Sequence, residues 1–287
     1  MRLPTRQIRL VAVDMDGTFL DSAGDYDRER FAALHARLRQ HGVTFVVASG
    51  NQYWALRRYF TDYPDVLYIA ENGALTGTTD RLLRSCPFSP ADAVGAVAVA
   101  ASLPSVFTLV CTSEAAYALR SSHSWHIDRL RRYYARIRLL DGFDEVHEPV
   151  LKLAITCPRD ATEVVQAQLA EALPPGCTPT SSGHGSIDVI PTGVNKGIAL
   201  GQLGDLLGVR LGDMVAFGDG GNDLEMLTCA GIGVSMANAP AHVHEASDQT
   251  TGSNDEAGVF AWLERHRHLW EVPEPRVFPT TTRQEMP

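Results

Sequence analysis

Cysteine is scarce and unpaired in this sequence. Its 287 residues contain five cysteines, and none of them forms a Cys-x-x-Cys pair. A disulfide framework or a thiolate zinc site needs closely spaced pairs, so the pattern disfavours both. We expect buried thiols in a reducing cytoplasm.

Positive charge is also in short supply. The chain has 25 Lys and Arg residues against 34 Asp and Glu residues, which gives a formal net charge of −9. Such a chain is a poor partner for nucleic acid or for an anionic membrane, and we expect neither. A small anionic ligand is compatible with this charge, because one cation and a few N–H groups can reverse the field inside a pocket.

Long apolar runs are missing as well. The first residues lack the apolar core and the small-residue cleavage site of a signal peptide. Residues 91–110 are apolar overall, but Asp92, Gly95, Ser102 and Pro104 interrupt them. We predict a buried helix followed by a strand there, and a cytoplasmic chain without a membrane segment.

What the sequence does have, at both ends, is an alternation of apolar and amphipathic segments. It predicts strands at 9–13, 44–48, 66–70 and 214–217, helices at 26–41, 52–60, 196–207 and 224–230, and a last apolar segment at 233–236. Apolar strands separated by helices predict a parallel sheet covered on both faces, which binds ligands at the carboxyl ends of its strands. Asp14, Ser49 and Glu71 each follow a strand, so we expect them at one edge.

The middle of the chain has a different pattern. It predicts helices at 91–102 and 161–172, a charged helical stretch at 127–138, and strands at 107–112, 116–119, 152–156 and 186–190. We interpret it as a mostly antiparallel α/β cap at 84–187, inserted into a core formed by 1–83 and 188–270. The Pro- and Thr-rich tail, 271–287, is predicted to be disordered.

The stretch Asp14-Met15-Asp16-Gly17-Thr18 follows the first apolar strand. Two carboxylates this close repel each other and lose water, which a cation or a shared proton can offset. We expect Asp14 to attack phosphorus as a nucleophile, and Asp16 to protonate the leaving oxygen and then deprotonate a water. The alternative is a pair that only caps a turn.

Residues 218–223, Gly-Asp-Gly-Gly-Asn-Asp, again place two carboxylates after a buried strand. Oxygen ligands suit Mg²⁺, and we expect Asp219 to bind it directly. Asp223 is expected to act through water or by fixing Lys196. The alternative is a Gly- and Asp-rich loop that caps the next helix.

Two further segments offer partners for a phosphate. Lys196 opens a helix, where a cation is unfavourable unless an anion lies nearby. Ser49-Gly50 supplies a hydroxyl and N–H groups after a strand. The alternatives are a solvated surface lysine and a simple helix N-cap.

These four signatures occur in the order of the haloacid dehalogenase superfamily of phosphotransferases, which the chain resembles over residues 8–265. Glu71-Asn72-Gly73-Ala74 is similar to the Cof-type subfamily (IIB), which carries a large α/β cap. Residues 48–53, and 180–183 leading into 187–188, are similar to a bacterial sugar phosphatase branch. One residue departs from the pattern, because Asn51 stands where most Cof-type proteins carry Arg.

The resemblance implies a Rossmann-like core, a Mg²⁺ cofactor and phosphomonoester hydrolysis. The implied metal ligands are Asp14, the backbone carbonyl of Asp16, and Asp219. The implied phosphate-binding groups are Ser49, Gly50, Lys196 and Asn222. The cap is expected to set specificity.

In the cap, His184, Lys152 and Asp188 are candidates for substrate contacts. His184 lies in a loop that leads back to the core, with a solvent-exposed position as the alternative. Lys152 sits in an apolar strand, where a substrate hydroxyl or Asp188 would satisfy it, and a surface salt bridge is the alternative. The arginines of 129–138 are predicted to form a solvated helix face, part of which a second substrate anion could use.

Together these features predict a Mg²⁺-dependent phosphatase of small phosphorylated metabolites, sugar phosphates by preference. It would be a monomer or weak homo-oligomer that works through an aspartyl-phosphate. A sugar phosphomutase, or a non-enzymatic phosphoacceptor or ligand sensor, remains as an alternative.

Overall fold

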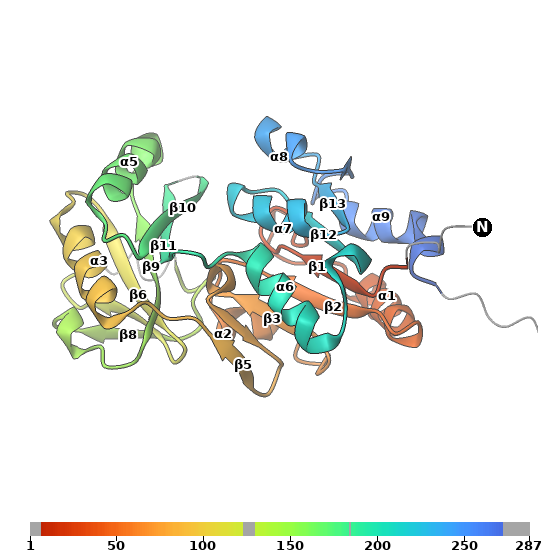
Figure 1. Cartoon of the computed structure of the whole chain (residues 1–287), viewed down its shortest axis with the longest axis horizontal. Helices are drawn as coiled ribbons and strands as arrows, with labels where there is room; N and C mark the ends of the chain where they lie inside the picture. The colour runs from red at the N-terminus through yellow and green to blue at the C-terminus, as the bar shows by residue number, and fades with distance from the viewer. Residues whose placement is uncertain (1–6, 123–129, 184, 272–287) are drawn as a thin grey trace, which may run out of the picture.

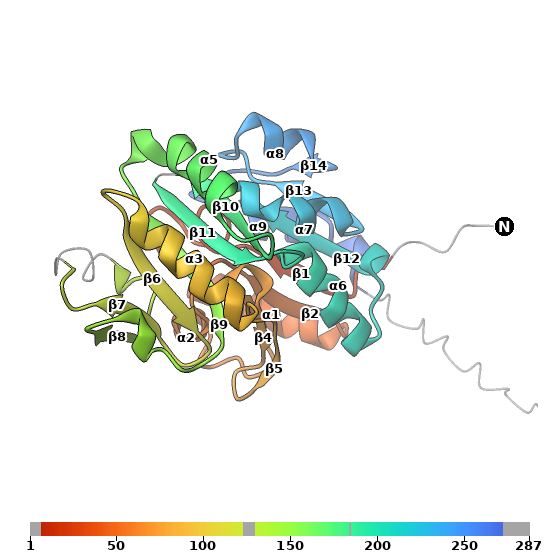
Figure 2. The ribbon, with the colours of Figure 1, turned by 60° about the vertical axis from the view of Figure 1, so that its left-hand side comes forward.

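Two β-sheets, each with its own helices, make up the protein (Figure 1). The computed structural model describes residues 7–122, 130–183 and 185–271. The chain crosses from one sheet to the other twice, between β5 and α3 and between β11 and α6, as Figures 1 and 2 show. The predicted α/β class, a parallel-sheet core with an inserted cap, is confirmed.

The core sheet has the strand order β14-β13-β12-β1-β2-β3-β4-β5. The first six of these are parallel, and β4 and β5 are added antiparallel at one edge. The strands are β1 (Leu10–Val13), β2 (Thr44–Ala48), β3 (Leu67–Ala70), β4 (Leu75–Gly77), β5 (Leu82–Ser85), β12 (Met214–Gly218), β13 (Ile232–Ser235) and β14 (Gln249–Thr250). The helices of this part are α1 (Arg28–Gln40), α2 (Tyr53–Leu56), α6 (Lys196–Leu207), α7 (Leu224–Cys229), α8 (Ala241–Glu245) and α9 (Gly258–Arg265).

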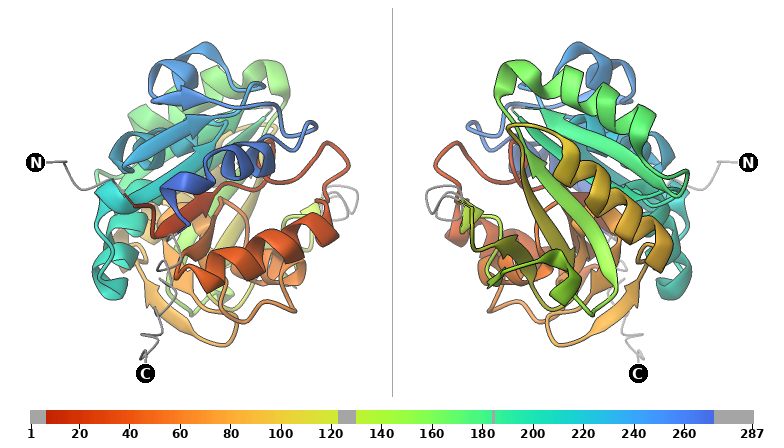
Figure 3. Two further views of the ribbon diagram at one scale, coloured as in Figure 1. Left: turned by 90° about the vertical axis from the view of Figure 1, so that its right-hand side faces the viewer. Right: turned by 90° about the vertical axis from the view of Figure 1, so that its left-hand side faces the viewer.

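Strand β1 shows how the sequence covers both faces of this sheet. Val11 and Val13 belong to a cluster with Phe31 of α1 and Phe260 of α9, whereas Leu10 and Ala12 belong to the cluster that includes α6 and α7. Figure 3 (left) shows α1 and α9 side by side over one face. Each fully buried Val or Leu side chain contributes roughly 1.5–3 kcal/mol. The sheet is therefore a rigid platform for the loops at its strand ends.

The cap sheet has the order β10-β11-β9-β6-β7-β8 and is antiparallel except where β7 and β8 pair. Its strands are β6 (Phe107–Thr112), β7 (Ala116–Leu119), β8 (Ile137–Leu140), β9 (Val150–Thr156), β10 (Cys177–Gly183) and β11 (Ser186–Pro191). Helices α3 (Pro90–Ser102) and α5 (Thr162–Ala172) cover its outer face (Figure 3, right). Its other face is turned to the core. The apolar stretch at 91–110 is divided between α3 and β6, and within the described ranges no helix is long and apolar enough to cross a membrane.

The helix predicted at 127–138 is wrong in its second half. Ile137 and Arg138 belong to β8, which pairs in parallel with β7, and residues 127–129 lie outside the described ranges. The side-chain amide of Gln52 holds the extended backbone at Arg136, because it donates to the Arg136 carbonyl (3.0 Å) and accepts from its N–H (2.9 Å). Tertiary pairing therefore overrides the helix propensity of the arginines.

The expected domain boundaries at 83/84 and 187/188 fall inside β5 and β11. By sheet membership, all of β5 belongs to the core and all of β11 to the cap. We therefore propose a core of 7–85 and 192–271 with a cap of 86–191. The segment 272–287, predicted to be a disordered tail, lies outside the described residues.

Candidate active site

The carboxyl ends of neighbouring core strands bring the predicted residues together. Val13 is aligned with Val47 of β2 and with Phe217 of β12, so the loops after these strands start at one level. A cavity of about 1080 Å³ opens there, between the core and the cap. Its lining includes the predicted site residues Asp14, Asp16, Ser49, Gly50, Lys152, Asp188, Asp219 and Asn222. Predicted residue His184 lies outside the described residues.

Lys196 lies below this cavity and is fully buried. It starts α6, whose N-cap Asn195 accepts from the N–H of Ile198 (2.8 Å). Its ammonium donates to Asp14 Oδ1 (2.6 Å) and to Asp223 Oδ1 (2.7 Å). Burial alone would lower the pKa of Lys196, but the two carboxylates outweigh it and hold that pKa above its usual range. The anion that a lysine at a helix N-terminus requires is therefore the aspartate pair.

Burial has the opposite effect on Asp14. Loss of water raises the pKa of its carboxyl well above the usual range, and the charges of Asp223 and Asp219 raise it further. Lys196 opposes this shift. An additional cation would have the same effect as Lys196.

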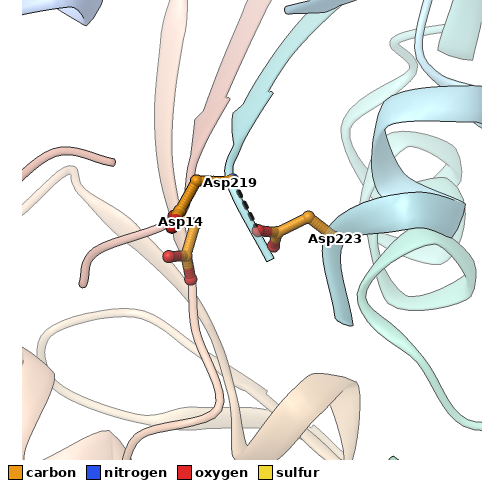
Figure 4. A group of neighbouring side chains, drawn as sticks. All are labelled: Asp14, Asp219 and Asp223. Carbon is orange, nitrogen blue, oxygen red and sulfur yellow. Dashed lines mark hydrogen bonds between the residues drawn. The ribbon is translucent and has the colours of Figure 1, made fainter. Parts of the chain in front are cut away.

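Asp223 organises the loop of residues 218–223, to which it belongs. Its Oδ2 accepts from the N–H groups of Asp219 (3.0 Å) and Gly220 (2.9 Å), while Oδ1 accepts from Lys196. Figure 4 shows the first of these bonds. Both oxygens of Asp223 thus accept from protein donors, whereas the side-chain donors to Asp14 and Asp219 contact their Oδ1 atoms. Asp14 and Asp219 are therefore the better placed of the three carboxylates to bind an ion.

A donor set for a hard cation surrounds this loop. One carboxylate oxygen from each of Asp14, Asp219 and Asp223 lies within 4.8 Å of the others (Figure 4). Burial, then the charges of Asp223 and Asp16, raise the pKa of Asp219 to about 6, although Thr18 donates to its Oδ1 (2.7 Å). Crowded oxygen ligands of this kind fit Mg²⁺.

Gly17 makes the close approach of Asp219 feasible. Its φ is +80°, in the left-handed region that glycine adopts without strain, and a Cβ there would overlap the Asp219 carboxylate. The glycine after the Asp-x-Asp pair is thus required by both backbone conformation and space.

Asp16 has partners that the sequence did not reveal. Asn51 Nδ2 donates to Asp16 Oδ2 (2.6 Å), so the residue that replaces the usual arginine contacts the expected acid/base group. A cation comes instead from the cap, where Arg132 Nη2 lies 3.8 Å from Asp16 Oδ1. Gly24, with φ +83°, leaves room for this guanidinium. Arg132 is one of four described arginines of the predicted solvated set, and all four are exposed.

Cap residues close the cavity from the other side. Leu109, Leu130, Tyr133, Tyr134 and Ala154 give it an apolar and aromatic wall. In β9 and β11 the residues alternate, so that Leu153 and Val189 pack beneath the cap helices while Lys152 and Asp188 face the core. The surface salt bridge considered for Lys152 is wrong, because its side chain is buried.

The site and fold together define a class of hydrolase. The chain belongs to the haloacid dehalogenase-like hydrolase family, whose pattern matches residues 11–263. It is 35% identical over 259 residues to the 5-amino-6-(5-phospho-D-ribitylamino)uracil phosphatase YbjI of Escherichia coli (strain K12), with 90% of this chain and 96% of that protein covered.

Solved structures agree with this assignment. SMU.1108c of Streptococcus mutans UA159 has a TM-score of 0.86 and 30% identity, over 91% of this chain and all of that one. The subclass IIB sugar phosphatase BT4131 has a TM-score of 0.78 over 90% of this chain and 99% of that one, and its 21% identity supports the fold alone. The resemblance to the haloacid dehalogenase superfamily is confirmed.

Lys196→Met is expected to destabilise the protein strongly. Asp14 and Asp223 would remain buried without their cation, which typically costs about 3–5 kcal/mol of unfolding free energy. Urea unfolding in the presence of EDTA measures this loss. The Lys196→Met/Asp14→Asn double variant is expected to recover part of it, and a single variant as stable as wild type would contradict the central role of this ion pair.

Proposed function

We propose that the protein is a Mg²⁺-dependent phosphatase of small phosphorylated metabolites that works through an aspartyl-phosphate on Asp14. The observation that carries this proposal is the contact of the Lys196 ammonium with Asp14 Oδ1 at 2.6 Å, beneath a cavity that also contains Asp16. A buried cation holds one carboxylate oxygen, and we assign the attack on phosphorus to the other, Oδ2.

In the first step, Asp14 Oδ2 forms a bond to phosphorus and the bond from phosphorus to the ester oxygen breaks. Asp16, protonated at this stage, gives its proton to the departing alkoxide. Asn51 and Arg132, which contact the Asp16 carboxyl from two sides, hold it in place. In the second step, Asp16 takes a proton from water as the water oxygen attacks phosphorus. The bond from Asp14 to phosphorus then breaks and inorganic phosphate leaves.

Negative charge is the main obstacle to both steps. Lys196, the Ser49 hydroxyl and the Asn222 amide are the groups we assign to the phosphoryl oxygens. Asp14, Asp219 and the carbonyl of Asp16 would hold Mg²⁺, and Asp223 would position Asp219 and Lys196. When bound, Mg²⁺ supplies charge neutralisation for the phosphoryl group.

The cavity wall supports a substrate that has more than a bare sugar attached to the phosphate. The predicted preference is for sugar phosphates, and the named substrate of YbjI carries a phosphoribityl chain joined to a uracil ring. Polar groups line the core side, while Tyr133, Tyr134 and Leu109 line the cap side. This arrangement favours a leaving group with a polyol near the phosphate and a flat ring beyond it.

A sugar phosphomutase is the second enzymatic candidate, since it would use the same aspartyl-phosphate and return the phosphoryl group to a sugar. Product analysis separates the two. Free phosphate in stoichiometric yield supports the phosphatase, and an isomerised sugar phosphate supports the mutase.

Asp14→Asn is expected to lower phosphate release by at least about a thousandfold, because the amide is a much weaker nucleophile. A phosphate-release assay on a panel of sugar phosphates measures this. Mass spectrometry must show that the introduced amide has not deamidated back to the carboxylate, and Asp14→Ala serves as a second variant. Wild-type turnover in both would rule out the proposed nucleophile.

Mg²⁺ is expected to raise the melting temperature of the wild-type protein and to restore activity after EDTA treatment. Binding to the folded state alone stabilises it by about 2.7 kcal/mol at a hundredfold excess over Kd. Asp219→Asn is expected to remove most of this thermal shift. Full activity in EDTA, or an undiminished shift in the variant, would be incompatible with the proposed site.

Tyr133→Ala is expected to affect ring-bearing substrates selectively. An aromatic pair contributes about 0.5–1.5 kcal/mol, so kcat/KM for a ribitylaminopyrimidine phosphate should fall about twofold to tenfold. For ribitol 5-phosphate, which has no ring, it should stay nearly constant. Equal losses on both substrates would remove the argument for a ring-binding wall.

A further inference from the structure

Lys152 forms a buried junction between the cap and the core. Only 1% of its side chain is exposed. Its Nζ donates to the Gly50 carbonyl (2.5 Å) and lies 2.9 Å from Glu71 Oε2 and 3.3 Å from Asp188 Oδ2. Gly50 and Glu71 belong to the core, whereas Asp188 is on cap strand β11. Three oxygens, two from the core and one from the cap, therefore surround this ammonium.

The Gly50 carbonyl links Lys152 to Ser49, which is assigned to the phosphate. It belongs to the peptide that joins Gly50 to Asn51, and the N–H of that same peptide donates to Ser49 Oγ (3.1 Å). The two ends of one peptide are therefore held by Lys152 and by Ser49. Because Ser49 Oγ accepts this bond, its own proton is left to donate, and in the proposed function it donates to a phosphoryl oxygen.

Glu71 is the core partner that keeps Lys152 charged. Its carboxylate is fully buried, and its contact with Lys152 is an ion pair rather than a well-aligned hydrogen bond. Burial raises the pKa of Glu71, and Lys152 opposes this rise. Glu71 and Asn72 have φ of 51° and 56°, left-handed values that non-glycine residues keep only where their surroundings impose them.

Asn72 extends the junction to the second phosphate-site loop. Its Nδ2 donates to Asp188 Oδ2 (2.5 Å), and its Oδ1 accepts from Asn222 Nδ2 (2.9 Å). Cap residues Lys152 and Asp188 thus reach both loops assigned to the phosphate, the first through the Gly50 carbonyl and the second through Asn72.

We propose that Lys152 is a positioning residue of the phosphate site, which holds the Gly50 peptide from the cap so that Ser49 is oriented toward the phosphoryl group, with Glu71 as its buried counter-ion. This inference rests on the proposed function, since it assigns Ser49 to the phosphate. Its consequence is that phosphate binding depends on the cap lying over the core. The proposal also reassigns Lys152 from a candidate substrate contact to a residue that acts through the loop.

The test is the affinity for inorganic phosphate in the presence of Mg²⁺, measured by calorimetry, because free phosphate has no leaving group for the cap to contact. Lys152→Met/Glu71→Gln removes Lys152 together with its fully buried counter-ion, and the remaining carboxylate, Asp188, is partly exposed and keeps its bond from Asn72. We expect its phosphate Kd to rise about tenfold or more, with kcat/KM reduced as well. Arg120→Met is the matched control, since it removes a cap cation whose ion pair with Asp141 is exposed, and its phosphate Kd should be unchanged.

Lys152→Arg gives a second arm that keeps the charge balance if the double variant does not fold. A planar guanidinium cannot reproduce the contacts of the ammonium with the oxygens of Gly50, Glu71 and Asp188, so the phosphate Kd should again rise. A folded variant with wild-type phosphate affinity would overturn the proposal, even if its turnover were lower, since Lys152 would then act on the leaving group or on stability alone. Wild-type protein that binds phosphate but hydrolyses no ester would refute the proposed function, while the same titrations would still decide the role of Lys152.

Discussion

A single buried ammonium holds the centre of this site together. Lys196 contacts Asp14 and Asp223, and Asp219 lies close to both carboxylates. These three carboxylates share one protein cation, so the loops that carry them are compatible with folding only because Lys196 offsets part of the charge. The remaining negative charge is what makes the cluster attractive to a divalent ion. In this arrangement both oxygens of Asp223 accept hydrogen bonds from protein groups, whereas Asp14 and Asp219 are better placed to bind an ion.

A second buried ammonium joins the cap to this centre. Lys152 resembles Lys196 in its surroundings. Each of these lysines is buried and lies between two carboxylates, and each contacts a loop of the proposed phosphate site. The difference lies in what they span. Lys196 connects elements of one sheet, and Lys152 connects two sheets. In the proposed function, its contacts make the geometry of the phosphate loop depend on the placement of the cap. The apolar wall around Tyr133 is then the part of the cap assigned to the leaving group.

The sequence was sufficient to predict which side chains come together at this edge of the core sheet, and the reason is local. Asp14, Ser49 and Asp219 each follow a short apolar strand, and strand order alone brings such positions to one edge of a parallel sheet. Lys152 was recognisable as unusual, since it interrupts an apolar strand, and Asp188 was named as a possible partner, but Glu71 was not. Glu71 is distant in the sequence, and no local pattern encodes a contact across the cap–core boundary.

The misassigned segment around Arg136 failed for a similar reason. Arginine-rich sequence favours a helix locally, and the competing term is a set of backbone bonds to Gln52 and to β7 that only the folded cap provides. The contact of Asn51 with Asp16 could not be predicted either. The sequence shows that the usual arginine is absent, but it does not show which group the asparagine contacts. Contacts between residues that are distant in the sequence are thus the part of this structure that sequence patterns do not predict.

The most direct test of the proposed chemistry is to trap the phosphorylated side chain. Wild-type protein turning over a phosphate ester with Mg²⁺ would be quenched in acid and treated with borohydride, which reduces an acyl phosphate to the alcohol, and the peptide that carries residue 14 would then be analysed by mass spectrometry. We predict homoserine at position 14 in the wild-type protein, and none when substrate is omitted. Active protein in which Asp14 is never modified, or in which another carboxylate carries the label, would contradict the proposal that Asp14, held by Lys196, is the group that receives the phosphoryl group.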